Sequence, residues 1–372
     1  MTNKIEQNIE QLLEGTGVKL NGPNPWDIQV KNDRFYQRVL TKGSLGFGES
    51  YMDGWWECDQ IDELVNRLLK DDVRKRLKKR WAVVALAVFS ILVNRQKGSR
   101  AFKIGEAHYD VGNKLYKAML DKRLVYTCGY WKGVNTLDEA QEQKLDLVCR
   151  KIGLKAGDRV LDIGCGWGSF AKFAAEKYNT EIVGITVSNE QLKLGKQLCK
   201  GLPVELRLQD YRNVNEKFDH IVSLGMVEHV GYKNYKDYMK VAARCLKDDG
   251  FFLLHTIGSK HSGRTTDPWI DKYIFPNSML PSLAQLTKAA EGSFLVEDVH
   301  NFGADYDKTL MAWFENFDSH WDELKDQYDE RFYRMWKYYL LACAGSFRSR
   351  QNQLWQIVLS KNGVKGVYQA VR

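Results

Sequence analysis

The sequence lacks closely spaced cysteines, and it lacks an apolar stretch long enough to cross a membrane. Its seven cysteines are scattered and none belongs to a C-x-x-C pair, which argues against a disulfide framework or a structural zinc site and predicts reduced thiols. The N-terminus has no apolar signal core. The longest apolar run, residues 81–93, falls short of the ~20 residues that a bilayer span needs. We therefore expect a cytoplasmic protein with no transmembrane helix and no metal site.

Internal repeats and low-complexity tracts are also missing, and the remaining composition is that of a folded chain. The 372 residues suffice for one large domain and a smaller one, and a content of 44% hydrophobic and 27% charged residues excludes wholesale disorder. The net charge of +8 permits an anionic partner, such as nucleic acid or an acidic lipid surface, without identifying one.

Residues 1–100 are expected to form a smaller, mainly helical N-terminal domain that binds lipid or membrane. Four glycines within residues 43–56 predict tight turns with aromatic side chains packed around them. Residues 73–80 carry six basic side chains and no acidic one, and the apolar run 81–93 follows at once. The basic run favours docking on an anionic membrane over a solvated helix face. The apolar run fits a membrane contact, a buried helix or a subunit contact equally well.

From residue 101 to residue 372 we expect the catalytic domain, because strands there alternate with helices. Short apolar strands are predicted at residues 159–163, 181–187, 204–208, 218–224 and 251–257, helices at 188–198 and 235–246, long helices within 305–350, and a last strand at 356–360. This alternation is typical of βαβ units in an α/β fold, with a doubly wound and mostly parallel sheet. Ser188, with Gln191 three positions later, predicts a capping box.

The glycine-rich segment after the first of these strands is the most informative motif. It reads Gly164-Cys165-Gly166-Trp167-Gly168, with Asp162 two residues ahead. Glycines let a backbone turn sharply and approach a ligand, and the following helix presents its free amides. A dinucleotide fingerprint would place its third glycine at position 169, where Ser169 stands. The G-x-G-x-G spacing instead resembles motif I of S-adenosylmethionine methyltransferases, which implies their class I fold.

Polar residues also follow the next two predicted strands. In these enzymes the second strand normally ends in an acidic residue that binds the ribose hydroxyls, and here Thr186 and Gln191 must serve instead. Each polar residue alone reads as a surface side chain, but the strand ends meet at the edge where open α/β sheets bind ligands. The expected cofactor-binding residues from the strand ends and the loop are Asp162, Gly164, Gly166, Gly168, Thr186, Gln191, Gln209, Asp210 and Tyr211.

Motifs along nearly the whole chain resemble those of bacterial cyclopropane-fatty-acyl-phospholipid synthases. The matching stretches are residues 43–59, 106–113, 126–131, 160–168, 223–231, 254–259, 302–306 and 338–348. The N-terminal stretch separates this group from the mycolic-acid enzymes, which are similar only across the catalytic domain. The resemblance implies that a methylene from S-adenosylmethionine is added across a cis double bond of a phospholipid acyl chain, through a carbocation that bound bicarbonate deprotonates.

The resemblance also implies roles for individual residues. The bicarbonate ligands map to Cys128, Glu228, His255, the backbone of Ile257, and Tyr306, while Tyr126 and Thr127 join the cofactor-binding set. Without the resemblance, His255 reads as a core histidine and Tyr306 as a packed aromatic. Cys343 matches a proposed catalytic cysteine, yet methyl transfer to an alkene needs no enzyme nucleophile, so we rank a structural role higher. His108 either contacts the cofactor or stabilises a turn.

Other functions are weighed against this one. An RNA or small-molecule methyltransferase would suit the positive charge, but no aromatic RNA-binding signature is present. The intact glycine loop argues against a non-catalytic membrane-binding protein. An enzyme that makes methyl-branched or otherwise modified acyl chains is the alternative within the family. We expect a peripheral association with an anionic phospholipid surface, a homodimer and no nucleic-acid partner.

Overall fold

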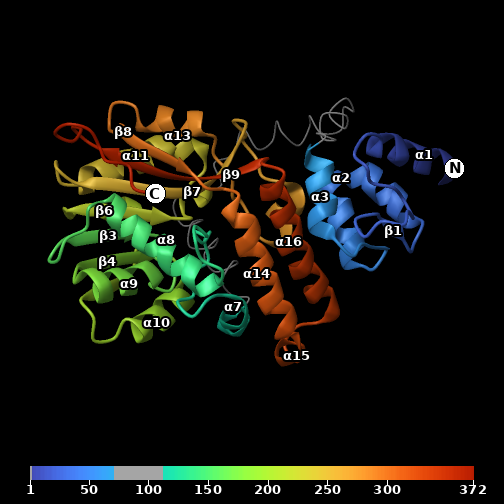
Figure 1. Ribbon diagram of the computed structural model, residues 1–372, viewed down its shortest axis with the longest axis horizontal. Coiled ribbons are helices and arrows are strands. Elements are labelled where there is room, and N and C mark those ends of the chain that lie inside the picture. Colours follow the sequence, from blue (N-terminus) through green and yellow to red (C-terminus); the bar gives the residue numbers. More distant parts are fainter. Residues whose placement is uncertain (1, 71–111) are drawn as a thin grey trace. The chain divides into compact units, whose positions relative to one another are not determined.

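The computed structural model describes residues 2–70 and 112–372, which divide between two compact units (Figure 1). One unit contains residues 2–70 together with Thr265–Pro276 and Tyr306–Asn352, and the other contains residues 112–264, 277–305 and 353–372. The basic run 73–80, the apolar run 81–93, His108 and the predicted boundary at residue 100 lie outside the described residues and stay predictions. Within the described ranges, no helix is both long enough and apolar enough to span a membrane.

The first unit is mainly helical, and its residues 2–70 agree with the mainly helical N-terminal domain that the sequence predicts. Its elements are α1 (Thr2–Leu13), α2 (Arg34–Met52), α3 (Ile61–Lys70), α12 (Pro268–Tyr273), most of α14 (Asp305–Ser319), α15 (Trp321–Leu324), α16 (Glu330–Arg348) and the antiparallel pair β1 (Gln29–Val30) and β2 (Trp56–Glu57). Helix α16 packs tightly on α3 at Gly345, where an added Cβ would lie 2.2 Å from the carbonyl oxygen of Asp62. A side chain at that position would force the two helices apart.

Only two of the four glycines in residues 43–56 form turns. Gly43 has φ 56° and interrupts α2, and Gly54 has φ 69° just beyond its end. Gly46 and Gly48 are helical instead, so the prediction of turns at all four was wrong. A Cβ on Gly48 would lie 2.4 Å from the indole ring of Trp269. Glycine is needed there because another helix packs against its backbone.

The second unit is built on a sheet of seven strands in the order β5-β4-β3-β6-β7-β9-β8. The strands are β3 (Arg159–Ile163), β4 (Glu181–Thr186), β5 (Val204–Leu208), β6 (His220–Leu224), β7 (Phe251–Ser259), β8 (Leu295–Asn301) and β9 (Asn352–Ser360). Strands β3 to β7 are parallel, and β8 pairs antiparallel with β9. The strand order reverses between β3 and β6, and open sheets bind ligands at such a reversal.

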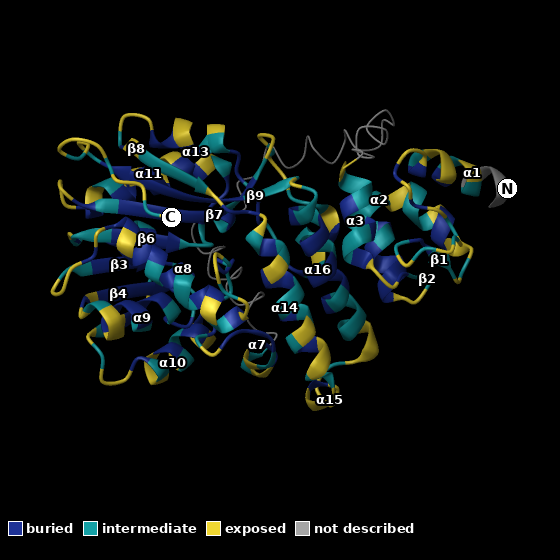
Figure 2. Cartoon of the chain, viewed as in Figure 1, coloured by how far each residue is buried: buried dark blue, intermediate teal, exposed yellow. Residues whose placement is uncertain are grey.

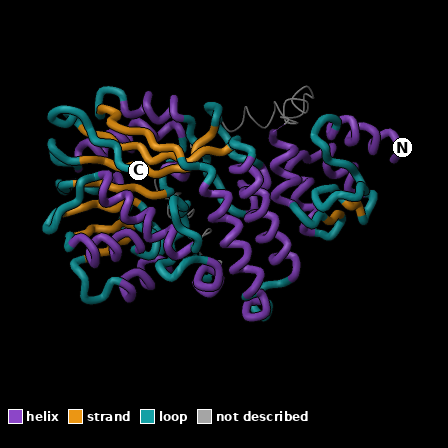
Figure 3. The backbone as a smooth tube through the Cα atoms, in the orientation of Figure 1, coloured by secondary structure: helices purple, strands orange, loops and turns teal. Residues whose placement is uncertain are grey.

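Helices cover both faces of this sheet, which confirms the doubly wound α/β fold (Figures 1 and 3). The covering helices are α8 (Leu137–Lys151), α9 (Ser169–Tyr178), α10 (Asn189–Leu198), α11 (Tyr235–Cys245) and α13 (Leu283–Ala290). The unit also contains α7 (Asn113–Met119) and the short turns η1 (Tyr211–Asn213), η2 (Val227–His229) and η3 (Tyr232–Asn234). Val160 packs with α8 and α9, while Leu161 and Ile163 pack with α11. The central strands are therefore buried on both sides (Figure 2).

Candidate active site

The loop between β3 and α9 turns at three glycines. Gly164, Gly166 and Gly168 have φ values of 83°, 57° and 81°, which other residues rarely adopt. A Cβ on Gly164 would lie 2.8 Å from the Met226 side chain, whereas a Cβ on Gly166 would meet no atom within 4 Å. Cys165 is buried and packs against Gly184. The loop thus combines a fixed backbone with open space beside Gly166, which fits a bound ligand.

Asp162 and Lys144 are two buried charges next to this loop. Asp162 lies in the centre of the sheet, and burial raises the pKa of its carboxyl to about 7. Lys144 projects from α8 and is fully buried, and burial lowers the pKa of its ammonium to about 8. Its Nζ donates a 2.8 Å hydrogen bond to Oγ1 of Thr127. Lys144 thereby holds a residue that the sequence places in the cofactor-binding set.

Thr186 and Gln191, the two residues expected at the ribose, bond to each other. The Thr186 hydroxyl donates to Oε1 of Gln191 over 2.9 Å. Ser188 caps α10, since its Oγ accepts the Gln191 backbone N–H at 3.3 Å. The reciprocal half of the predicted capping box is not formed, so that part of the prediction was wrong. The Gln191 side chain turns to Thr186 because the buried hydroxyl competes for its carbonyl oxygen.

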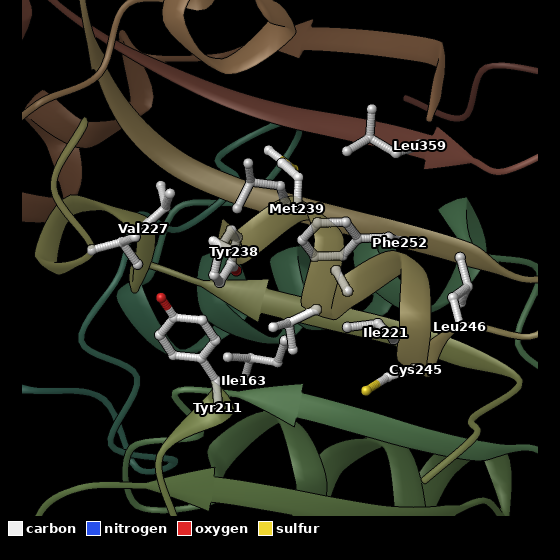
Figure 4. Close-up of a cluster of buried hydrophobic side chains, with 14 of the residues drawn as sticks. Ile163, Tyr211, Ile221, Val227, Tyr238, Met239, Cys245, Leu246, Phe252 and Leu359 are labelled. Carbon is white, nitrogen blue, oxygen red and sulfur yellow. The ribbon is translucent and has the colours of Figure 1, made fainter. Parts of the chain in front are cut away.

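The residues after β5 have different environments. The N–H of Gln209 donates to the Thr186 carbonyl over 3.0 Å, which places Gln209 beside the end of β4. Asp210 caps η1 and forms an ion pair with Arg212 at 2.5 Å. Tyr211 lies in the hydrophobic cluster on the α11 face, where its ring centroid is 5.3 Å from that of Tyr238 (Figure 4). In the structure the Tyr211 ring packs in the hydrophobic core. Its contact with a cofactor stays a prediction.

Glu228 lies in η2, which follows β6, and it is almost completely buried. Burial raises the pKa of its carboxyl to about 7, against the opposing effect of two backbone N–H groups and the Thr256 hydroxyl. The N–H of Ile257 donates to Oε1 over 2.8 Å. The other oxygen, Oε2, has no hydrogen-bond partner in the part of the chain that the structure describes. An unpaired buried polar atom costs about 1–3 kcal/mol, which a bound ligand can offset.

His255 lies on β7 beside the end of β6, and only 1% of it is exposed. Burial lowers the pKa of its imidazole well below the ordinary value, and the positive charges of Lys144 and Lys151 lower it further. Its Nδ1 lies 3.3 Å from Nε2 of Gln356 on β9. Its Nε2 lacks a partner among residues 2–70 and 112–372. The sheet therefore brings a second unpaired polar atom to the edge that holds Glu228.

Cys128 and Tyr126 lie on the segment that joins α7 to α8. Cys128 is fully buried, and its thiol donates to the Gly129 carbonyl over 3.2 Å. The Tyr126 ring packs edge-on against Tyr116, with centroids 5.2 Å apart. The segment is tied to α8, since the Gln141 side chain donates to the Thr127 carbonyl over 2.8 Å. This anchoring fixes both predicted site residues on the same unit as the glycine loop.

Tyr306 and Cys343 belong to the first unit. The Tyr306 ring lies 4.4 Å from Phe347 and 5.9 Å from Trp313, between centroids. Cys343 lies in α16, and burial raises the pKa of its thiol to about 12. A nucleophilic cysteine must be a thiolate. The raised pKa keeps Cys343 protonated near neutral pH, which supports the structural role.

Lys144 and Gln356 are buried polar residues that contact predicted site residues and that sequence reasoning missed. Lys144 lies on the same face of its helix as Gln141, Leu145 and Val148, all of them buried. A lysine within such a face was the available signal. Gln356 interrupts the apolar run of β9. A polar residue inside a continuous buried strand costs free energy, so it also pointed to a function.

Comparisons with known proteins show which family the chain is similar to. A family model described as mycolic acid cyclopropane synthetase matches residues 96–357. The chain is 51% identical over 357 residues to the cyclopropane-fatty-acyl-phospholipid synthase of Escherichia coli (strain K12), covering 96% of this chain and 94% of that protein. It is 40% identical to a probable fatty acid methyltransferase of Pseudomonas putida, covering 94% of this chain and 91% of that protein.

Solved structures show the same fold. The crystal structure of the mycolic acid cyclopropane synthase CmaA1, complexed with SAH and CTAB, superposes with a TM-score of 0.66 and 32% identity, covering 70% of this chain and 98% of that one. The chain therefore belongs to the mycolic acid cyclopropane synthetase family and has the class I fold of S-adenosylmethionine-dependent methyltransferases.

Proposed function

We propose that the protein is a cyclopropane-fatty-acyl-phospholipid synthase. The relative that carries this name in Escherichia coli is 51% identical across 96% of the chain. The structural observation that supports it best is the buried carboxyl of Glu228, held through Oε1 by Ile257 and unpaired at Oε2 in the described residues. Such a group can take up a proton in a site from which water is excluded.

The reaction transfers a methyl group from S-adenosylmethionine to one carbon of a cis double bond. The C–S bond breaks, the π electrons of the alkene form the new C–C bond, and the positive charge moves to the other alkene carbon. Loss of a proton from the added methyl group closes the ring. The products are S-adenosylhomocysteine, the cyclopropane and one proton, so the site must bind the cofactor and take up that proton.

The cofactor would be held by the glycine loop and by the ends of β4 and β5. Gly166 adjoins open space at the start of α9, where the free backbone amides favour a polar or anionic group. The Thr186 hydroxyl is committed to Gln191. The amide nitrogen of Gln191 is therefore the group left to bind a ribose hydroxyl. Lys144 fixes the Thr127 hydroxyl by donating to its oxygen, so that the hydroxyl proton points to another acceptor.

Bicarbonate would supply the base for ring closure, held in the second unit by Cys128, Glu228, His255 and Ile257, while the part of Tyr306 rests on the family resemblance alone. Both Glu228 Oε2 and His255 Nε2 are unpaired in the described residues, and they would play opposite parts: Oε2 would accept a hydrogen bond from the bicarbonate O–H, and a protonated Nε2 would donate to a bicarbonate oxygen. The N–H of Ile257 donates to Glu228, and its carbonyl accepts the Thr256 hydroxyl over 2.9 Å, so the part given to Ile257 rests on the family resemblance. The raised pKa of Glu228 makes Oε2 a proton acceptor near neutral pH. His255, which is neutral, would offer a hydrogen bond from Nε2.

The substrate alkene lies within a bilayer, so the enzyme must reach a membrane surface. We infer peripheral docking through the basic run 73–80 and the apolar run 81–93. Both runs lie outside the described residues, and support for docking comes from the sequence alone. We also propose that the protein forms a homodimer.

The test is a product analysis after incubation with S-adenosylmethionine, bicarbonate and vesicles of unsaturated phospholipid. A cyclopropane product gains one methylene group and contains no double bond. A methyl-branched saturated chain, or a methylene-branched chain that keeps a double bond, would instead favour the alternative within the family. No change in the lipid under these conditions would contradict the proposal.

A further inference from the structure

Gln356 is a buried amide within an apolar strand. None of its surface is exposed, and its neighbours on β9 include Leu354, Ile357 and Val358. Side chains alternate along a strand, so Gln356 lies on the same face as Val358, which packs with α8 and α9. Burying an amide without full hydrogen bonding is unfavourable. Packing alone does not account for glutamine at this position.

The polar contact of Gln356 in the structure is with His255. Strand β9 lies next to β7, and Nε2 of Gln356 is 3.3 Å from Nδ1 of His255. An amide nitrogen only donates, so Nδ1 must accept with its lone pair. A neutral imidazole carries one proton, and that proton must then be on Nε2. His255 is neutral because burial and two nearby lysines lower its pKa.

We propose that Gln356 is a positioning residue that holds His255 in the tautomer with its proton on Nε2. In this tautomer the unpaired Nε2 is a fixed hydrogen-bond donor, which is the form that binds an anion. In the other tautomer Nε2 would present a lone pair to the anion and repel it. The assignment of that anion as bicarbonate rests on the proposed function, while the assignment of the tautomer does not.

Two variants separate the hydrogen bond from the packing. Gln356→Met removes the donor and keeps a side chain of similar length. Gln356→Glu keeps the shape but accepts a hydrogen bond, so it draws the proton to Nδ1. Ile357→Val is the control, because it trims a neighbouring buried side chain on the opposite face of the strand. That change causes a small loss of stability without touching His255.

The first measurement is the tautomer of His255 by nitrogen-15 NMR of histidine-labelled full-length protein, with the signal assigned by a His255→Asn variant. In the wild-type protein and in Ile357→Val, the proton is expected on Nε2. Gln356→Met should show a mixture of tautomers, and Gln356→Glu should show a proton on Nδ1. A wild-type signal with the proton on Nδ1 would overturn the proposal, even if neither Gln356 variant folded.

The second measurement is steady-state turnover with vesicles at a range of bicarbonate concentrations. Both Gln356 variants should lose at least about tenfold in kcat, since a positioned acid–base group contributes roughly 10²–10⁴-fold. The KM for S-adenosylmethionine should not change. Gln356→Met with the kcat and bicarbonate dependence of Ile357→Val would refute the positioning role. The NMR signal is measured without substrate, so the spectra decide the tautomer independently of turnover. A wild-type protein that makes no cyclopropane would contradict the proposed function but not the tautomer.

Discussion

The backbone N–H of Ile257 and the carboxyl of Glu228 are joined by a 2.8 Å hydrogen bond to Oε1. Ile257 lies on β7, and Glu228 lies in the turn after β6, so the bond connects two adjacent strand ends. It fixes one oxygen of a buried carboxyl and leaves the other without a protein partner in the described residues. The chemistry proposed for the site depends on this asymmetry.

Replacing Glu228 by Gln should lower kcat by roughly 10²–10⁴-fold, because an amide cannot take up a proton. The affinity for S-adenosylmethionine should stay unchanged, since the cofactor loop follows a different strand. In the wild-type enzyme the rate should rise with pH through about 7, the pKa of Glu228, as the carboxyl becomes ionised. The measurement is a pH–rate profile at constant bicarbonate concentration. If the rate of Glu228→Gln rose with pH over the same range, the rise would be due to the ionisation of another group.

The same substitution should stabilise the fold at alkaline pH. Burial raises the pKa of Glu228 from 4.5 to about 7, so the folded protein binds more protons than the unfolded chain between these values. Stability is therefore full at low pH and falls as the pH rises through this window, by up to about 3 kcal/mol for this group. Denaturant unfolding should show Glu228→Gln gaining stability over wild type at pH 8 and little at pH 4. An equal difference at both pH values would contradict the raised pKa.

Gly166→Val should abolish most cofactor binding and leave the fold intact. The residue has φ 57°, and its added side chain would enter the open space beside the loop. Gly157→Val is a matched control, because Gly157 also has a positive φ of 86° and nothing within 4 Å of its added Cβ, but it precedes the opposite end of β3. Titration calorimetry with S-adenosylmethionine measures both. Equal affinities in the two variants would show that the loop is not the cofactor site.

Lys144→Met should weaken cofactor binding because the Thr127 hydroxyl loses its donor. The pKa of Lys144 is lowered to about 8, so the lysine is charged below that pH and wild-type affinity should fall as the pH rises through it. Lys151→Met is the control, a second buried lysine on the same helix whose Nζ contacts His300 instead. Calorimetry at pH 7 and pH 9 should show a cofactor affinity that depends on pH in wild type and in Lys151→Met, but not in Lys144→Met. The same dependence in Lys144→Met would exclude this role.

Local patterns predicted most of the second unit. The parallel strands were found because short apolar or alternating runs recur between helical stretches, and the glycine loop because its spacing is specific. Strand β8 was missed because it is a half-exposed edge strand with charged residues. Lys144 and Gln356 were missed because a polar side chain is normally expected to face solvent, and only the packing around α8 and β9 buries these two. Which atom of Glu228 stays unpaired depends on strand register, and no pattern along the chain reports that.

The central claim is ring closure by loss of a proton from the transferred methyl group. It is tested most directly by mass spectrometry of phospholipid incubated with the enzyme and S-adenosylmethionine that carries a fully deuterated methyl group. The account predicts an acyl chain that gains a carbon with two of the three deuterium atoms and contains no double bond. An acyl chain that retains all three deuterium atoms would show a methyl branch and would contradict the account.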